Sequence, residues 1–280
     1  MERDSDAFGP LGLDTEYPAQ YDPGLLCPIE RASGRRWIYE GLAEGESLPF
    51  KGVDYWNAYE FSWLEHSGKP RVGVMELAVP FHSPNIVESK SLKLYFNSLN
   101  QHRFSQVSEV IATVSRDLEA VIGVPVEVKL HTDVDHEDHY AVSVLKGELI
   151  DKEDITVEQF AVDKTVLCCV SDEVVSETLV SHLLRSNCPV TSQPDWASVQ
   201  IRYLGPKIDR AGLLKYIISY RTHNEFHEQC VERMFMDIHE LCGTEQLTVY
   251  ARYTRRGGID INPFRSDFEM PYGNVRLLRQ

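Results

Sequence analysis

The sequence lacks several features that would assign a protein to a class at once. It has no run of about 20 apolar residues that could span a bilayer, and the start, Met1 to Pro18, has no apolar signal-peptide core. It also has no surplus of positive charge, since 28 Lys and Arg stand against 43 Asp and Glu, a formal net charge of −15. We therefore expect neither a membrane nor a nucleic-acid partner, because phosphate binding depends on clustered cations.

Disulfide, zinc-knuckle and common nucleotide-binding patterns are also missing. The six cysteines form no CxxC pair, which indicates free thiols and a cytoplasmic protein; they are Cys27, Cys168, Cys169, Cys188, Cys230 and Cys242. No GxGxxG or Walker sequence occurs, so a bound nucleotide would need another arrangement. What the chain does have is 280 residues, 42% of them hydrophobic, enough for one large or two ordinary globular domains.

The chain contains an internal repeat. When the sequence is shifted by 122 positions, residues 83–93 fall on residues 205–215, and five positions over a span of 21 match without a gap. A repeat of this kind predicts two copies of one structural unit. The matched pairs are Pro84/Pro206, Ile86/Ile208, Leu92/Leu214, Lys93/Lys215 and Phe104/Phe226.

Hydrophobic periodicity predicts the same elements in both copies. Apolar residues recur at helical spacing after Phe104 up to Gly123, and after Phe226 up to Gly243, so each copy should hold a long helix that ends at glycine. Alternating patterns predict a strand after each helix and two strands before it. The unit is therefore β-β-α-β, twice. The predicted strands are 59–64, 72–79 and 126–130 in the first copy, and 199–203, 214–220 and 247–253 in the second.

These patterns divide the chain into four parts. We expect an N-terminal extension, a first module, an acidic linker or insert and a second module, at residues 1–50, 51–132, 133–172 and 173–280. The linker prediction rests on the acidic, histidine-containing stretch 132–138 and the less regular segment after it. Apolar residues on one side of 173–185 also predict a helix, which proline stops at Asn187-Cys188-Pro189.

Cys188 is a candidate nucleophile at the start of a turn-rich loop. Catalytic groups favour such loops, and Asp195 follows seven residues later, within reach as a proton donor if burial raises its pKa. An ordinary buried cysteine beside a Pro-Asp-Trp turn explains the same residues. The partial negative charge of a helix C-terminus would also disfavour a thiolate, so activation would have to come from another group.

Two further segments are candidates for binding polar ligands. His227 and Glu228 begin the second long helix and suit a flat polar ring, with the carboxylate accepting from adjacent N–H groups. A charged first helical turn explains them as well. Arg256 and Gly257 lie in Thr-Arg-Arg-Gly-Gly (254–258), where cations and flexible backbone N–H groups suit a phosphate, although an ordinary basic turn fits equally.

The two copies differ at their most polar points in a complementary way. The second copy has His227-Glu228 where the first has Ser105-Gln106, and the first has Glu88-Ser89-Lys90 where the second has Arg210-Ala211-Gly212. This pattern indicates a duplicated enzyme whose site uses both halves. Independent drift of two structural copies would also produce it.

One segment carries a family signature. Residues 88–95, Glu-Ser-Lys-Ser-Leu-Lys-Leu-Tyr, resemble the E-(S/L)-K-(S/A)-hydrophobic-K-(L/Y)-(Y/F/W) motif of the 7-cyano-7-deazaguanine reductases, the NADPH-dependent enzymes of queuosine biosynthesis. All eight positions fit. The second half resembles the long, two-module branch of that family over residues 181–196, 224–233 and 250–266, and the similarity runs from about Tyr21 to the last residue.

The resemblance implies a fold and a set of roles. It implies an α+β tunnelling fold with antiparallel sheets, two modules in the chain and a homodimer. Cys188 matches the residue that forms a covalent thioimide with the nitrile, and Asp195 matches the acid. The family residues that hold the deazaguanine ring match Ile86, Val87, Glu88, His227 and Glu228. The family residues that contact NADPH match Ser89, Lys90, Arg256 and Gly257.

The implied reaction takes four electrons from two NADPH molecules and converts the nitrile to a primary amine, with no metal. The proximity of Asp195 and His227 would supply the thiol activation that the helix terminus does not. The rival hypothesis is a zinc-dependent pterin-forming hydrolase of the same fold, with Cys188, His227 and Cys230 as ligands. A ligand-binding scaffold without catalysis is the non-enzymatic alternative, and the presence of every expected site residue argues against it.

Overall fold

The chain divides into two units, and neither is a continuous stretch of sequence. The computed structural model describes residues 17–39, 47–133, 141–271 and 273–280. Unit 1 consists of Met1–Gly34, Asp54–Tyr140 and Arg255–Asp260. Unit 2 consists of Arg35–Val53, Ala141–Thr254 and Ile261–Gln280. The four-part division into 1–50, 51–132, 133–172 and 173–280 stays a prediction, and most of the acidic stretch 132–138 lies outside the described residues.

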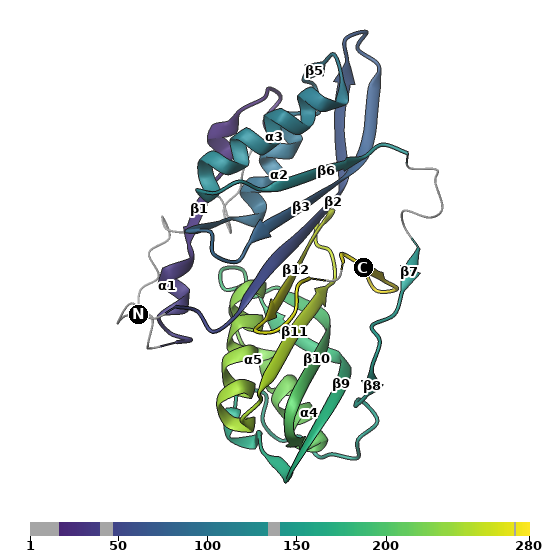
Figure 1. Cartoon of the computed structure of the whole chain (residues 1–280). Helices are drawn as coiled ribbons and strands as arrows, with labels where there is room; N and C mark the ends of the chain where they lie inside the picture. The colour runs from purple at the N-terminus through teal and green to yellow at the C-terminus, as the bar shows by residue number, and fades with distance from the viewer. Residues whose placement is uncertain (1–16, 40–46, 134–140, 272) are drawn as a thin grey trace. The chain divides into compact units, whose positions relative to one another are not determined.

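Unit 1 is an antiparallel sheet with two helices on one face (Figure 1). The sheet order is β6-β3-β2, and the short strand β5 pairs with the end of β2. A separate two-stranded sheet joins β1 to β4. The elements are η2 (Pro23–Leu25), β1 (Pro28–Glu30), α1 (Arg31–Arg35), β2 (Lys51–Glu65), β3 (Pro70–Pro80), β4 (Asn85–Val87), α2 (Ser89–Ser98), β5 (Arg103–Phe104), α3 (Val107–Ile122) and β6 (Glu127–His131).

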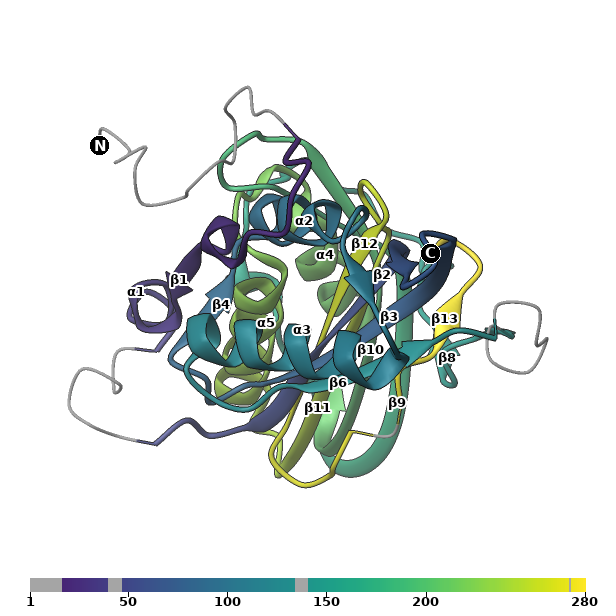
Figure 2. The same cartoon turned by 90° about the horizontal axis from the view of Figure 1, so that it is seen from above.

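Unit 2 repeats this design with longer strands. Its sheet runs β12-β11-β10-β9 with antiparallel neighbours, and β8 adds to β9 in parallel. Helices α4 and α5 pack against the strands of this sheet (Figure 2). The elements are β7 (Val142–Ser143), β8 (Glu148–Leu149), η5 (Lys164–Val166), β9 (Cys169–Asn187), β10 (Pro194–Ile208), α4 (Arg210–Ser219), η6 (Tyr220–Thr222), α5 (His227–Cys242), β11 (Gln246–Tyr253), β12 (Ile259–Ser266) and β13 (Arg276–Leu277).

The predicted fold class is confirmed, as are the two long helices. Both modules are α+β with antiparallel strands. Helices α3 and α5 end at Gly123 and Gly243, which adopt left-handed backbone conformations with φ of 87° and 59°. Glycine takes this conformation without the steric cost that a Cβ imposes. Strands β2, β3, β6, β10 and β11 lie where alternation predicts them, except that β6 begins one residue after Val126.

Two predicted elements are of the wrong type. Residues 173–185 belong to strand β9, which pairs with β10 along its length, from Cys169 opposite Ile208 to Asn187 opposite Pro194. Its many β-branched residues suit a strand, and they outweigh the apolar spacing that indicated a helix. Residues 214–220 are mostly in helix α4, whose first turn is capped by the Asp209 carboxylate. The unit is therefore β-β-α-α-β.

The repeat is real, but its register differs from the gap-free match. In unit 1 the Tyr95 hydroxyl donates to the Asp117 carboxylate at 2.7 Å, and in unit 2 Tyr216 donates to Asp237 at 2.6 Å. These pairs place equivalent residues 121 apart in the first helix of each unit and 120 apart in the second. The pairing at 122, including Phe104 with Phe226, is wrong because the connections between elements differ in length. His227 and Glu228 correspond to the first two residues of α3, Val107 and Ser108.

The duplication also includes a segment ahead of the first long strand. Residues 22–27 and 163–168 share the pattern Asp-x-x-x-Leu-Cys, and each forms a 3-10 turn capped by its aspartate. The structural counterpart of Cys27 is therefore Cys168. The equivalent contacts are Asp22 N to Ser98 Oγ and Asp163 N to Ser219 Oγ, then Glu88 N to Cys27 O and Asp209 N to Cys168 O.

A buried triad of charges ties the early segment of unit 2 to its later elements. The Glu232 carboxylate on α5 is 2% exposed and receives two guanidinium groups, those of Arg35 and Arg265. Removing one partner of such a buried group leaves a charge without compensation and costs about 3–5 kcal/mol. None of the helices in the described ranges combines the length and apolar character needed to cross a membrane.

Replacing the two capping glycines tests these helix ends. At Gly243 an added Cβ would meet nothing within 4 Å, so Gly243→Ala should lose only the left-handed preference, about 1 kcal/mol of unfolding free energy. At Gly123 the Cβ would lie 2.6 Å from Pro84 Cγ, so Gly123→Ala should cost more. Guanidinium unfolding followed by circular dichroism measures both. Equal losses at the two positions would contradict the contact with Pro84.

Candidate functional site

Cys188 and Asp195 lie at the two ends of one hairpin loop. Strands β9 and β10 pair Asn187 with Pro194 and Ser186 with Asp195, so the loop between them is residues 188–193. The Cys188 N–H donates to the Gln193 carbonyl at 2.9 Å, which closes the loop. Cys188 thus follows a strand and not a helix. The predicted unfavourable helix terminus is absent at this position, because the residues before Cys188 are extended.

The Cys188 thiol is buried and receives a backbone hydrogen bond. Cys188 is 3% exposed, and the Thr191 N–H donates to its sulfur at 3.5 Å. Ser192 completes the turn with a left-handed φ of 56°, a conformation that is uncommon for a residue with a side chain. Its hydroxyl accepts from the Asn224 amide at 3.2 Å.

Asn187 joins this hairpin to the segment that leads into α5. Its N–H donates to the His223 carbonyl at 2.8 Å, and its carbonyl accepts from the Glu225 N–H at 3.2 Å. Its side-chain amide also donates to Asn224 Oδ1 at 3.2 Å. The residue before Cys188 is therefore fixed to the residues just before His227.

His227 and Asp195 form a buried pair in unit 2. His227 Nε2 lies 3.3 Å from Asp195 Oδ2, and Asp195 is 3% exposed. The imidazole stacks on the Tyr253 ring with centroids 3.7 Å apart and planes 1° from parallel. Among the described residues, buried His227 Nδ1 has no hydrogen-bond partner, an arrangement that costs free energy unless a ligand supplies one. Glu228, the next residue of α5, is 2% exposed.

A second carboxylate holds the segment before α5 in place. Glu225 accepts from His223 Nε2 at 2.8 Å and from two nitrogens of Arg233 at 2.6 and 3.1 Å. Burial alone would raise the pKa of Glu225, but the hydrogen bonds and charges of His223 and Arg233 outweigh it and hold that pKa below the usual 4.5. The carboxylate is therefore ionised at neutral pH and anchors the loop.

In unit 1 the predicted substrate residues lie in and after strand β4. Ile86 and Val87 are buried and pair with Ile29 and Pro28 of β1. The Glu88 carboxylate caps α2, accepting from the backbone N–H groups of Lys90 at 2.6 Å and Ser91 at 2.7 Å. Burial raises the pKa of Glu88, and these N–H groups oppose the rise. Its side chain thus has a structural role that the signature alone did not reveal.

Near the predicted cofactor residues of unit 1 lies a further cation, Lys93, which was not among the predicted site residues. Ser89 and Lys90 begin α2, and one turn later Lys93 interacts with Arg256 and Glu60. A Cβ added at Gly257 would lie 1.2 Å from Lys93 Nζ. Burial lowers the pKa of Lys93, and Arg256 acts in the same direction while Glu60 opposes it. Lys93 belongs to the family signature, which could have identified it.

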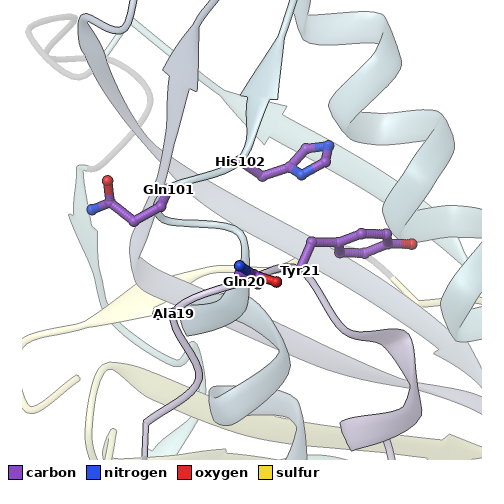
Figure 3. Close-up of a pocket in the computed structure, with 5 residues that line it drawn as sticks. All are labelled: Ala19, Gln20, Tyr21, Gln101 and His102. Carbon is purple, nitrogen blue, oxygen red and sulfur yellow. The ribbon is translucent and has the colours of Figure 1, made fainter.

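In unit 2 the structure thus pairs Asp195 with His227, with Cys188 on the hairpin of Asp195 and Glu228 next to His227 on α5, while the seven other predicted site residues lie in unit 1. Within the described ranges, no group of three or more His, Cys, Asp or Glu side chains is arranged to hold a metal ion. A pocket of about 280 Å³ in unit 1 contains none of the predicted residues (Figure 3). It is lined by Ala19, Gln20, Tyr21, Gln101 and His102.

Comparisons with known proteins point to one family. Residues 17–130 match the family model described as nitrile reductase, 7-cyano-7-deazaguanine-reductase N-term, and residues 194–271 match the model described as QueF-like protein. Proteins named NADPH-dependent 7-cyano-7-deazaguanine reductase from Bordetella parapertussis, Bordetella pertussis and Bordetella bronchiseptica are each 53% identical over 272 residues. The match covers 97% of this chain and 98% of each relative.

Glu225→Gln tests the anchor of this loop. A carboxylate with a depressed pKa stabilises the fold above its unfolded pKa of about 4.5, and that contribution is lost as the pH falls through the folded pKa. We expect the variant to lose about 1–3 kcal/mol at pH 7 and the difference from wild type to shrink below pH 4.5. Denaturant unfolding between pH 3 and 7 measures it. Glu158→Gln, at an exposed position of unit 2, is the control and should show no such difference.

Proposed function

We propose that the chain reduces the nitrile of 7-cyano-7-deazaguanine to the primary amine in queuosine biosynthesis. It belongs to the family of NADPH-dependent 7-cyano-7-deazaguanine reductases. The observation that carries this proposal is the buried pair of Asp195 and His227 in unit 2, with buried Cys188 on the same hairpin as Asp195 and buried Glu228 next to His227. A thiol, an acid and polar ring-binding groups are what nitrile activation requires.

Cys188 is the proposed nucleophile. Its sulfur adds to the nitrile carbon, one C–N π bond breaks, and the electron pair moves to the nitrogen, which takes a proton to give a thioimide on Cys188. The Thr191 N–H donates to this sulfur and helps to fix its position. The rigid hairpin holds the sulfur in one position, because both ends of the loop are paired strands.

Asp195 is the proposed proton donor to the nitrile nitrogen. Its carboxyl group is buried at the second position of β10, on the same hairpin as Cys188. The imidazole Nε2 3.3 Å away is placed to exchange a proton with Asp195 between steps.

His227 and Glu228 are the proposed contacts of the deazaguanine ring. With the Nε2 proton directed at Asp195, His227 Nδ1 is an acceptor for a ring N–H, which would satisfy the buried atom that has no partner among the described residues. The Glu228 carboxylate can accept from two adjacent N–H groups. Substrate contacts by Ile86, Val87 and Glu88 stay part of the proposal, with the Glu88 carboxylate also fixing the first turn of α2.

The group around Lys93 fits the phosphates of NADPH. The partly buried ammonium lies beside Arg256, and an anion between them would offset a repulsion that lowers the pKa of Lys93. Gly257 leaves space at the ammonium that a side chain would fill. Ser89, Lys90, Lys93, Arg256 and Gly257 would hold the nucleotide, which supplies a hydride in each of two rounds. Cys188 leaves after the first reduction, so the other ring contacts must retain the imine while nucleotide is exchanged.

We further infer a cytoplasmic homodimer. The six cysteines are free thiols, as a reducing compartment requires, and the net charge of −15 opposes a nucleic-acid partner. Apolar side chains are exposed in and near strands β7 and β9, which suits contact with a second copy. They are Val142, Val144, Val170 and Val174, between 54% and 81% exposed.

The proposed nucleophile is tested by adduct formation and cofactor consumption. The full chain mixed with 7-cyano-7-deazaguanine, without NADPH, should gain the mass of one substrate, and adding NADPH should then lower its absorbance. Cys188→Ala should abolish both signals, whereas Cys168→Ser, at an exposed position, should leave them unchanged. Stoichiometric zinc in the purified protein, or equal NADPH consumption by Cys188→Ala, would favour the zinc-hydrolase alternative or another mechanism.

Lys93→Met tests the proposed nucleotide contact. Because a hydrogen bond to a charged group contributes about 1.5–3 kcal/mol, we expect the KM for NADPH to rise about tenfold or more while the adduct still forms without NADPH. Lys129→Met removes an exposed lysine of the same unit that pairs with Glu127, and it should leave the KM near wild type. Steady-state kinetics at varied NADPH concentration distinguish the two. An unchanged KM in Lys93→Met would remove Lys93 from the proposed site.

A further inference from the structure

We propose that Tyr253 is a positioning residue that fixes the ring plane of His227, and that the side chains of Gln280 and Asn262 hold Tyr253 in place. This inference rests on the proposed function, in which His227 contacts the substrate and exchanges a proton with Asp195. It adds Tyr253 of β11, Asn262 of β12 and Gln280, which follows β13, none of which the signature or the proposed mechanism includes.

The first observation is the geometry of the stack. The imidazole and phenol rings are parallel within 1° with centroids 3.7 Å apart, so the Tyr253 ring covers one face of the imidazole. Tyr253 is fully buried, and burial raises its pKa well above the usual 10, with Cys230 and Asp195 acting in the same direction. At neutral pH the imidazole of His227 is therefore stacked on the uncharged, buried phenol ring of Tyr253.

The second observation is how the Tyr253 backbone is held. Its N–H donates to Asn262 Oδ1 at 3.0 Å, and its carbonyl accepts from Gln280 Nε2 at 2.9 Å. The same Gln280 nitrogen also donates to Asn262 Oδ1 at 2.8 Å. Two side-chain amides thus close a ring of hydrogen bonds around one residue of β11. Asn262 is 0% and Gln280 5% exposed.

The third observation is that the Gln280 amide is completely used. Its oxygen accepts from Arg252 Nε and from the Leu277 N–H, each at 3.0 Å, while its nitrogen makes the two bonds to Tyr253 and Asn262. A glutamine amide offers two donors and two acceptor sites, and all four are satisfied. A carboxylate of the same shape has no donor, so Gln280→Glu would lose the bond to the Tyr253 carbonyl and the bond to Asn262 Oδ1.

The consequence concerns the direction of the two imidazole nitrogens. Rotation of the His227 ring would move Nε2 away from Asp195 Oδ2 and turn Nδ1 away from its present direction. A flat ring pressed against one face opposes that rotation, and a branched aliphatic side chain does so less well because it is not flat. The ring of Tyr253, and not its hydroxyl, is the group that acts.

Four variants of the full-length chain separate positioning from general packing. Tyr253→Phe keeps the ring, Tyr253→Leu removes it, Gln280→Glu loosens its support, and His227→Ala removes the group to be positioned. The rate of adduct formation should be near wild type in Tyr253→Phe and about three- to tenfold lower in Tyr253→Leu, with a smaller loss in Gln280→Glu. The KM for NADPH should not change. Circular dichroism confirms that each variant is folded, and Gln280→Glu carries the test if Tyr253→Leu is not.

The decisive comparison is made in the His227→Ala background. If Tyr253 acts through His227, Tyr253→Leu should cause no further loss of rate there, since coupled residues are not additive. An equal loss in both backgrounds, or a loss in Tyr253→Phe as large as in Tyr253→Leu, would overturn the inference. If Tyr253→Leu is not folded, the same comparison with Gln280→Glu decides.

A measurement independent of activity separates this inference from the proposed function. The Hε1 resonance of His227, assigned with His227→Ala, should be displaced by the tyrosine ring in wild type and in Tyr253→Phe, and should return toward the unstacked position in Tyr253→Leu. Absence of any adduct in wild type would contradict the proposed function, yet the resonance would still report the stack. An unmoved resonance in folded Tyr253→Leu would overturn the positioning role.

Discussion

The candidate site depends on two backbone hydrogen bonds made by Asn187, one to His223 and one from Glu225. They connect the end of β9 to the entry of α5, so the hairpin with Cys188 and Asp195 and the helix with His227 and Glu228 share one fixed point. The ionised Glu225 carboxylate, bound by His223 and Arg233, keeps the entry segment in that position. Together with the packing of α5 against β9, β10 and β11, this connection holds the buried pair of His227 and Asp195 in place.

Much of the fold could be predicted from the sequence, and the errors have a common origin. Where apolar residues recur every three to four positions up to a glycine, the prediction is right, as for α5, and alternation predicts most strands, such as β11, with 214–220 as the exception. Residues 173–185 have apolar spacing that fits a helix, but they pair along their whole length with β10, and that long-range pairing decides their conformation. In α4, the apolar run from Leu213 to Ile218, broken only by Lys215, leaves no clear helical period in the sequence.

The site could be predicted as a set of positions but not as an arrangement. The family signature identifies residues of unit 1, and the segments around Cys188 and His227 identify residues of unit 2. The pairing of His227 with Ser105 was wrong, because the two units differ in the lengths of their connections. The Thr191 donor, the Tyr253 stack and the Gln280 amide have no local pattern. They follow from turn geometry and from contacts between residues distant in the chain.

The triad of Arg35, Glu232 and Arg265 has a consequence for how the protein is made. During synthesis, Arg35 leaves the ribosome almost 200 residues before Glu232. Unit 1 likewise needs Arg255–Asp260 for completion. Domains commonly fold one after another from the N-terminus as the chain emerges. Here neither unit has all its parts until the last few dozen residues are translated, so the early segments must wait, partly folded, for strands that arrive at the end.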